Sequence, residues 1–191
     1  MKHNVFALEL LLRLEPNDTL RERLRDLVTR HPEASSAGAK WKLLRRVTEL
    51  LLENERLFEK GCWDFFDDDE RALKDYHMWS YGMISEEGAR KMPSGRPVAD
   101  GGEPRYMTFT ISLLLKAVSP CARELGAYCD IPEADLWKRA TFRRILKGLS
   151  KVSFAAVKSD VLYLIPGEPE WGLTEADLQA EKFEYLRKIA S

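Results

Sequence analysis

Two stretches of the chain alternate apolar and polar side chains, which is the pattern of a β-strand with one buried face. The first runs from Val5 to Leu14, where Glu9 and Arg13 are the polar positions. Its apolar face holds Phe6, Leu8, Leu10, Leu12 and Leu14. The second, RYMTFTISLLLKA at 105–117, places Thr108, Thr110 and Ser112 opposite its apolar face. A shorter apolar run, Val161 to Ile165, stops at Pro166–Gly167 and predicts a third strand.

Between these strands the apolar residues recur at helical spacing. The first predicted helix starts at Pro16–Thr19 and ends at His31–Pro32, with the stripe Leu20, Leu24, Leu27 and Val28. The second is capped by Ser35–Ser36 and has the seam Leu44, Val47, Leu51 and Phe58, and the third covers about 68–91. The fourth opens at Asp130–Glu133 with the stripe Phe142, Ile145, Leu146 and Leu149, and the last runs from Thr174 to the end. Residues 92–104, rich in Gly and Pro, predict a long mobile loop.

These elements predict an α+β fold in the order β-α-α-α-β-α-β-α. We expect a small, mainly antiparallel, three-stranded sheet with the helices packed on its apolar face. A chain of 191 residues forms one such domain, residues 1–191, with the loop at 92–104 as an excursion. No internal repeat is visible in the sequence.

Composition narrows the class of protein. With 45% hydrophobic and 32% charged residues the chain is globular, and its net charge of -1 argues against a protein whose main role is to wrap nucleic acid. No apolar run approaches the roughly 20 residues of a membrane span, and the N-terminus lacks the features of a signal peptide. Three cysteines without metal-type spacing predict a reduced, cytoplasmic environment.

The titratable residues suggest no catalytic centre or metal site. Of the three histidines only His77 has an aromatic and acidic neighbourhood, and the simpler interpretation is a surface or core-edge side chain. Cys62, Cys121 and Cys129 are spaced too widely for the short ligand pairs of a zinc site. The acidic run 67–70 suits a helix start better than a calcium loop, and no glycine-rich phosphate loop is present. We expect no catalytic residues, metal or cofactor.

Two basic helix faces are the candidate partner surfaces. The stronger one belongs to the fourth predicted helix and consists of Lys138, Arg139, Arg143, Arg144 and Lys147. The other lies in KWKLLRR and consists of Lys40, Lys42, Arg45 and Arg46. Such a face can bind phosphates or an acidic partner, although most basic faces are simply solvated.

Trp171 stands in a turn between the third strand and the last predicted helix. Thr174 and Asp177 match the pattern of a helix start, so the turn geometry is set by that helix. A tryptophan just before the cap can pack against the first helical turn or stand exposed as part of a binding site. We favour the packed interpretation.

Three stretches of the chain carry a family resemblance. The first is NVFALELLLRLEPNDTLRERLRDLV with SSAGAKWKLLRRVTELLL, and the second is RYMTFTISLLL. The third runs from DLWKRATFRRILKGL through VLYLIPGEPEWGLTEADL. Together they resemble a family of cyanobacterial and chloroplast proteins of unknown function that includes the thylakoid fluctuating-light-acclimation protein. The resemblance implies a shared fold and a regulatory rather than enzymatic role, and it assigns no site residues. The aromatic-rich middle of this chain departs from the family pattern.

The sequence therefore predicts a non-catalytic, cytoplasmic interaction or regulatory domain, an adaptor that binds a protein partner. The alternative is a binder of nucleic acid or of an acidic surface through Arg139, Arg143, Arg144 and Lys147, recognisable by salt-sensitive affinity. An enzyme of an unrecognised type is the third interpretation, and a deep pocket lined by titratable groups would favour it.

Overall fold

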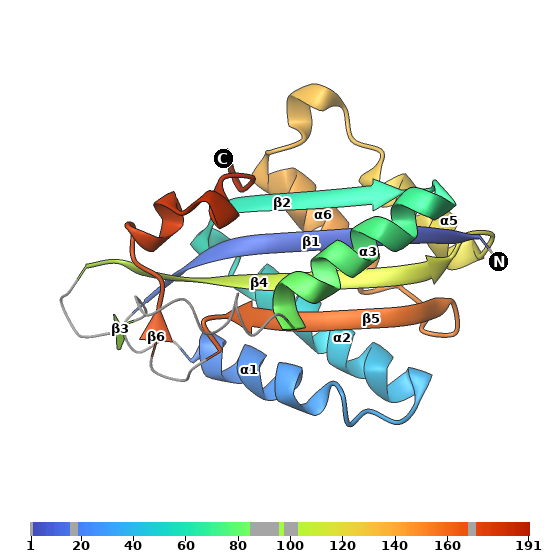
Figure 1. Ribbon diagram of the computed structural model, residues 1–191, viewed down its shortest axis with the longest axis horizontal. Coiled ribbons are helices and arrows are strands. Elements are labelled where there is room, and N and C mark those ends of the chain that lie inside the picture. The colour runs from blue at the N-terminus through green and yellow to red at the C-terminus, as the bar shows by residue number, and fades with distance from the viewer. Residues whose placement is uncertain (1, 16–18, 85–95, 98–102, 168–170) are drawn as a thin grey trace.

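The computed structural model describes residues 2–15, 19–84, 96–97, 103–167 and 171–191 (Figure 1). Within these ranges, the side chains of 81–84, 96–97 and 171 are not described. The loop predicted at 92–104 therefore falls mostly outside the description.

A five-stranded antiparallel sheet forms the centre of the fold, with strand order β5-β4-β1-β2-β7 (Figure 1). Its strands are β1 (His3–Leu14), β2 (Phe58–Phe66), β4 (Arg105–Lys116), β5 (Val157–Ile165) and β7 (Arg187–Lys188). Two short strands, β3 (Arg96–Pro97) and β6 (Trp171–Gly172), pair separately. The α+β class and the strands β1, β4 and β5 agree with the prediction from the sequence, but the predicted three-stranded sheet is wrong.

The missed strand β2 has no clean alternation for a pattern to reveal. Its sequence FEKGCWDFF carries a glycine in the middle, and most of its side chains are partly buried rather than divided between a buried and an exposed face. The predicted seam of the second helix included Phe58, which is in fact the first residue of β2. The helix ends at Glu53, where Asn54 Nδ2 donates a 2.8 Å hydrogen bond to the Leu50 carbonyl and closes the last turn.

Four helices cover one face of the sheet and a fifth crosses the other. On the first face lie α1 (Leu20–Arg30), α2 (Ala37–Glu53), α5 (Pro120–Cys129) and α6 (Arg139–Leu149). The helix α3 (Asp69–Ile84) crosses the face turned toward the viewer in Figure 1 and packs on Val5 and Leu114. The prediction that the helices share one face is therefore wrong, and α5, capped by Ser119, was not predicted.

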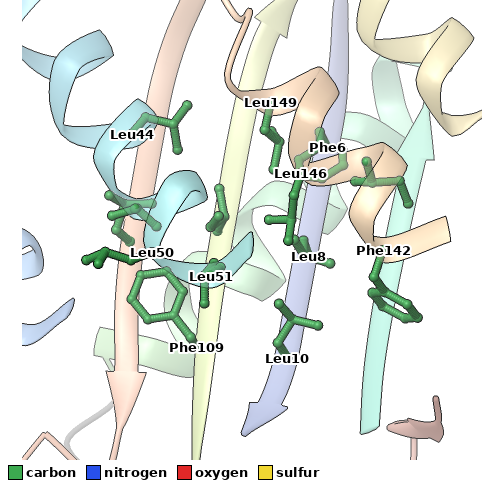
Figure 2. Close-up of a cluster of buried hydrophobic side chains, with 14 of the residues drawn as sticks. Phe6, Leu8, Leu10, Leu44, Leu50, Leu51, Phe109, Phe142, Leu146 and Leu149 are labelled. Atoms are coloured by element: carbon green, nitrogen blue, oxygen red, sulfur yellow. The ribbon is translucent and has the colours of Figure 1, made fainter. Parts of the chain in front are cut away.

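The main core lies between the sheet and the four helices. Phe6, Leu8 and Leu10 of β1 point from the sheet toward α2 and α6 (Figure 2). The helices supply Leu44, Leu50 and Leu51 from α2 and Phe142, Leu146 and Leu149 from α6. Gly61 of β2 makes this packing possible, because a Cβ there would lie 2.6 Å from Cε1 of the Phe142 ring. The glycine that obscured the strand in the sequence thus makes room for a core aromatic.

The topology repeats even though the sequence shows no repeat. β1 and β4 each have 12 residues, are each followed by a helix pair, and each return as a 9-residue antiparallel strand, β2 or β5. The strand pairing shifts register between Leu11 and Leu12 in the first unit and between Leu114 and Leu115 in the second. The two β-α-α-β units meet side by side through β1 and β4, which pair along their full length.

The chain end is not the helix that the sequence predicted. Thr174 and Asp177 do form the expected reciprocal bonds, since Thr174 N donates to Asp177 Oδ2 at 2.7 Å and Asp177 N donates to Thr174 Oγ1 at 3.2 Å. Only single 3₁₀ turns follow, at Asp177–Gln179 and Glu181–Phe183, before β7. Three apolar residues anchor this irregular chain end: Leu178, Phe183 and Leu186. They pack on Leu11 and Tyr106 beside the α3 face of the sheet.

Candidate functional site

A cavity of about 580 Å³ opens on the α3 face of the sheet. Its floor comes from β1, β2 and β5, and its walls come from α3 and from the chain end. The lining residues are Glu9, Cys62, Asp64, Phe66, Arg71, Asp75, Met78, Trp79, Tyr163, Ile165, Lys182, Phe183 and Tyr185. This cavity is the candidate site, because it combines apolar walls with a few convergent polar groups.

Glu9 lies at the floor of the cavity. The pairing of the strands places it in one row across the sheet with Cys62, Thr110 and Tyr163. The residue is only 2% exposed, and Tyr185 Oη donates a 2.6 Å hydrogen bond to its Oε2. Burial raises the pKa of Glu9, and the hydroxyls of Tyr185, Thr108 and Thr110 lower it by smaller amounts. Glu9 is therefore a buried carboxyl whose protonated form is favoured.

A row of hydroxyls runs along β4 beside this carboxyl. Thr108, Thr110 and Ser112 are fully buried. Their side-chain oxygens make no hydrogen bond with any other part of the chain that the structure describes. The hydroxyls of Thr108 and Thr110 nevertheless lie close enough to Glu9 to lower the pKa of its carboxyl. The polar face that the sequence predicted for this strand is real, but it is covered rather than solvated.

Aromatic side chains form most of the wall. Trp79 of α3 meets Tyr185 edge to face, with ring centroids 6.2 Å apart. Met78 is 64% exposed and Tyr185 is 42% exposed, so these two residues mark the mouth. The hydroxyl of Tyr185 nevertheless reaches the buried carboxylate, and this side chain connects the mouth to the floor.

The other charged side chains of the cavity lining differ in how deeply they are buried. Burial raises the pKa of Asp64, which is half-buried on β2. At the surface, Arg71 Nε donates to Asp75 Oδ2 at 3.3 Å, and its guanidinium lies 3.6 Å from the centroid of Phe66. Lys182 is also exposed as a whole, but partial burial of its amine lowers its pKa. Carboxyl groups thus lie deep and cationic groups lie at the rim.

The cavity holds a thiol, but its chemistry is unsuited to nucleophilic attack. Burial raises the pKa of Cys62 to about 12, with Asp64 and Glu9 adding to the effect. Burial also raises the pKa of Tyr163 and of Tyr185. At neutral pH these groups keep their protons, so they serve as hydrogen-bond donors and weakly polar walls. Among the residues that the structure covers, no three His, Cys, Asp or Glu side chains cluster as metal ligands do.

The basic face predicted on α6 is largely bonded to the chain itself. Arg139 donates to the carbonyl oxygens of Glu55 and Phe58, and Arg143 forms a two-point ion pair with the Glu55 carboxylate. Arg144 Nη2 donates to the Ala127 carbonyl at 2.7 Å.

Lys138 Nζ pairs with Asp135 at 2.5 Å, and Lys147 is exposed at the end of the row. These bonds attach α6 to its neighbours and give the arginines a structural role. The use of this face by a partner stays a prediction. In the second basic face, Arg45 and Arg46 pair with Glu49, and Lys40 pairs with Asp160.

The other residues considered in the sequence do not come together. Cys121 and Cys129 lie on α5, across the sheet from Cys62, and His77 is exposed on α3. In the acidic run, Asp68 Oδ1 accepts from Arg71 N at 2.9 Å, as a helix-start residue does, and Asp69 Oδ1 accepts from His3.

Trp171 is described only through its backbone. It pairs with Pro97 between β3 and β6, while the adjacent Leu173 is fully buried and bonded to Tyr106. The packing of the Trp171 side chain lies outside the described residues, so its interpretation stays a prediction.

Sequence reasoning recorded Glu9 only as a polar position on the first strand. The sequence did contain one signal for the site. If the two long predicted strands pair, Glu9 of the first lies on the same face of the sheet as the hydroxyls of Thr108, Thr110 and Ser112 of the second. What could not be inferred is the cover, since α3 and the chain end close over this face through contacts between residues far apart in sequence, such as Tyr185 and Glu9.

Comparisons of the chain with protein-family models, with curated proteins and with solved structures give no match. The family resemblance inferred from the sequence therefore stays a prediction. None of the helices within the described ranges is long and apolar enough to cross a membrane.

Glu9→Gln is expected to change how stability depends on pH. Because the folded-state pKa of Glu9 is raised, its contribution is fully present below the ordinary value of 4.5 and is lost as the pH rises through the folded pKa. Glutamine keeps the shape of the protonated carboxyl and removes this loss. Urea unfolding over a pH series should show the wild type losing stability relative to Glu9→Gln above pH 4.5.

The control for this series is Glu133→Gln, which alters an exposed glutamate in the same way and should run parallel to the wild type. Parallel curves for Glu9→Gln and wild type would show that the carboxyl is solvated in the folded protein.

Proposed function

We propose that the protein is a non-catalytic, regulatory ligand-binding domain and that the cavity over Glu9 is its binding site. The observation that supports this proposal is a cavity of about 580 Å³ whose aromatic and aliphatic walls surround one buried carboxyl. Small-molecule sites typically have volumes of roughly 300–1,000 Å³ and a few polar groups in an apolar lining.

The chemistry of the lining supports binding rather than turnover. A nucleophile needs a neighbouring base or a lowered pKa, whereas the pKa of Cys62 is raised to about 12. A regulatory role is also what the family resemblance implies.

Ligand binding has a direct route to the surface. Tyr185 contacts the floor through its hydroxyl and the solvent through its ring, and Met78 stands exposed at the same mouth. A ligand in the cavity therefore alters the surface that a protein partner would meet. The expected protein partner and the cytoplasmic location are part of this proposal, and the three free cysteines agree with a reduced compartment.

A fragment screen followed by the indole N–H resonances of tryptophan tests the proposal. Trp79 lines the cavity, whereas Trp41 of α2 packs on the opposite face of the sheet and is the internal control. Trp79→Phe and Trp41→Phe assign the two signals. We expect small aromatic fragments to shift the Trp79 resonance, to leave Trp41 unchanged, and to compete with one another. A screen in which no fragment shifts Trp79 selectively would refute the cavity as a binding site.

A further inference from the structure

The carboxyl groups of the cavity lining lie at the floor and its cationic groups lie at the rim, and this arrangement favours one class of ligand. The deepest group is Glu9, at 2% exposure, and Asp64 is half-buried above it. Neither carboxyl forms an ion pair with another residue that the structure describes. The two cationic groups of the lining, Arg71 and Lys182, are exposed at the rim. A positive charge that enters the cavity therefore meets unpaired carboxyl groups at the bottom.

Arg71 lies at the rim, where it has two partners, and its charge lowers the pKa of Asp64 by less than burial raises it. Its Nε donates to Asp75, whose side chain is only 16% exposed, and its guanidinium lies over the Phe66 ring. The carboxyls that remain for a ligand are those of Glu9 and Asp64.

Tyr185 donates to only one of the two Glu9 oxygens, Oε2, which leaves Oε1 for a ligand. The hydroxyls of Thr108 and Thr110 also act on this carboxyl and lower its pKa, but they carry no charge. Glu9 also lines the cavity, so a donor placed there can reach it. A charged N–H donor would satisfy this oxygen and stabilise the ionised carboxylate, and charge-assisted bonds of this kind are the strong ones.

The walls also suit a cation. Arg71 lies 3.6 Å from the Phe66 centroid and Lys182 lies 5.2 Å from the Phe183 centroid, so two rings of the lining already attract positive groups. Trp79, Tyr163 and Tyr185 add further aromatic rings to the lining. An anionic ligand, in contrast, would oppose the ionisation of Glu9 and Asp64, so only a cation gains a charge-assisted bond at the floor.

We propose that the ligand is a small organic cation with an apolar body, its protonated nitrogen bound to Glu9 and its body held by the aromatic walls. This inference rests on the proposed function, since it names the ligand class for the same cavity.

Binding of such a ligand is coupled to a proton. Because burial favours the protonated form of Glu9, a bound cation drives the carboxyl to ionise and releases a proton. Affinity for the cation then rises with pH. The charged and titratable groups that face Glu9 are Cys62 and Asp64 of β2, Tyr163 of β5, Arg71 and Asp75 of α3, and Lys182 and Tyr185 of the chain end.

Three probes of similar shape and different charge test the inference by calorimetric titration: 2-phenylethylamine, 2-phenylethanol and 3-phenylpropionate. We expect the amine to bind the wild type, the alcohol to bind at least ~10-fold more weakly, and the carboxylate to give no heat of binding, because one charged hydrogen bond corresponds to about tenfold or more in affinity. Affinity for the amine should rise with pH, with release of a proton.

Glu9→Gln should lower the affinity for the amine by about 10–100-fold and leave that for the alcohol unchanged, which also shows that the variant is folded. Glu133→Gln should behave as the wild type. If the amine and the alcohol bind the wild type equally, or Glu9→Gln does not affect the amine, the cation inference is wrong while the cavity remains a binding site. If none of the probes binds, both proposals are wrong.

Discussion

Phe142→Ala is expected to lower the free energy of unfolding by about 3–5 kcal/mol, because it removes a large ring from a filled core. Phe142 is fully buried in α6, and its ring occupies the space that Gly61 of β2 leaves open. The backbone glycine cannot move in to fill the cavity, so the lost packing is not recovered. Urea denaturation monitored by circular dichroism measures the change.

Two control variants show whether the loss comes from packing. Phe142→Leu should cost less, since it keeps part of the buried volume. Met78→Ala, at a side chain that is 64% exposed, should stay within about 0.5 kcal/mol of the wild type, as surface changes usually do. A Phe142→Ala protein as stable as the Met78→Ala protein would mean that α6 does not pack on β2 as described.

Asp160→Ala is expected to cost about 3–5 kcal/mol, the range for a buried ion pair that loses one partner. The Asp160 side chain on β5 is only 6% exposed and pairs with His31, which is 7% exposed, and with Lys40 Nζ at 2.6 Å. These contacts attach the end of α1, at His31, and the first turn of α2, at Lys40, to the sheet. Without the carboxylate, His31 is left buried beside a cavity.

The matched control is Glu49→Ala. Glu49 pairs with Arg45 and Arg46 on the surface of α2, at 39% side-chain exposure, and its loss should cost no more than about 1 kcal/mol. Equal losses for Asp160→Ala and Glu49→Ala would show that the Asp160 cluster is solvated.

Acid adds a second test of the same cluster. Burial raises the pKa of Asp160, but the hydrogen bonds from His31 and Lys40 outweigh burial and hold the pKa below the ordinary value of 3.8. A lowered pKa means that the contribution of Asp160 is present above 3.8 and is lost as the pH falls through the folded value. The stability gap between the wild type and Asp160→Ala should therefore narrow in acid, and a gap that stays constant would contradict the ion pair.

The strands that the sequence predicted correctly are those whose alternation is imposed by burial. β1 and β4 place leucines and phenylalanines on one face because the four helices pack there. That apolar face can be recognised from the sequence alone. β2 was missed because its residues FEKGCWDFF do not alternate and include a glycine, although β1 and β4 are even more buried on both faces. Period-two reasoning needs an alternation of residue types, and β2 does not have one.

The candidate site was less accessible to sequence reasoning than the fold. The arginines of α6 are the most conspicuous charges in the sequence, but in the structure Arg139, Arg143 and Arg144 bond to other parts of the chain. The residue that defines the cavity is a single glutamate in a leucine-rich strand. Its burial depends on Tyr185, more than 170 positions away. Local patterns carry no information about such a contact.

The paired β-α-α-β units have a consequence for how the protein is assembled during synthesis. Synthesis delivers the first unit, through β2, before β4 and the chain end. Without β4, β1 has a free edge beside Glu9, because β1 pairs with β4 along its full length in the folded protein. Only when β4 docks along that edge and the chain end arrives does the same group become buried. The cavity is thus absent from either half alone, because its lining comes from β1, β2, α3, β5 and the chain end together.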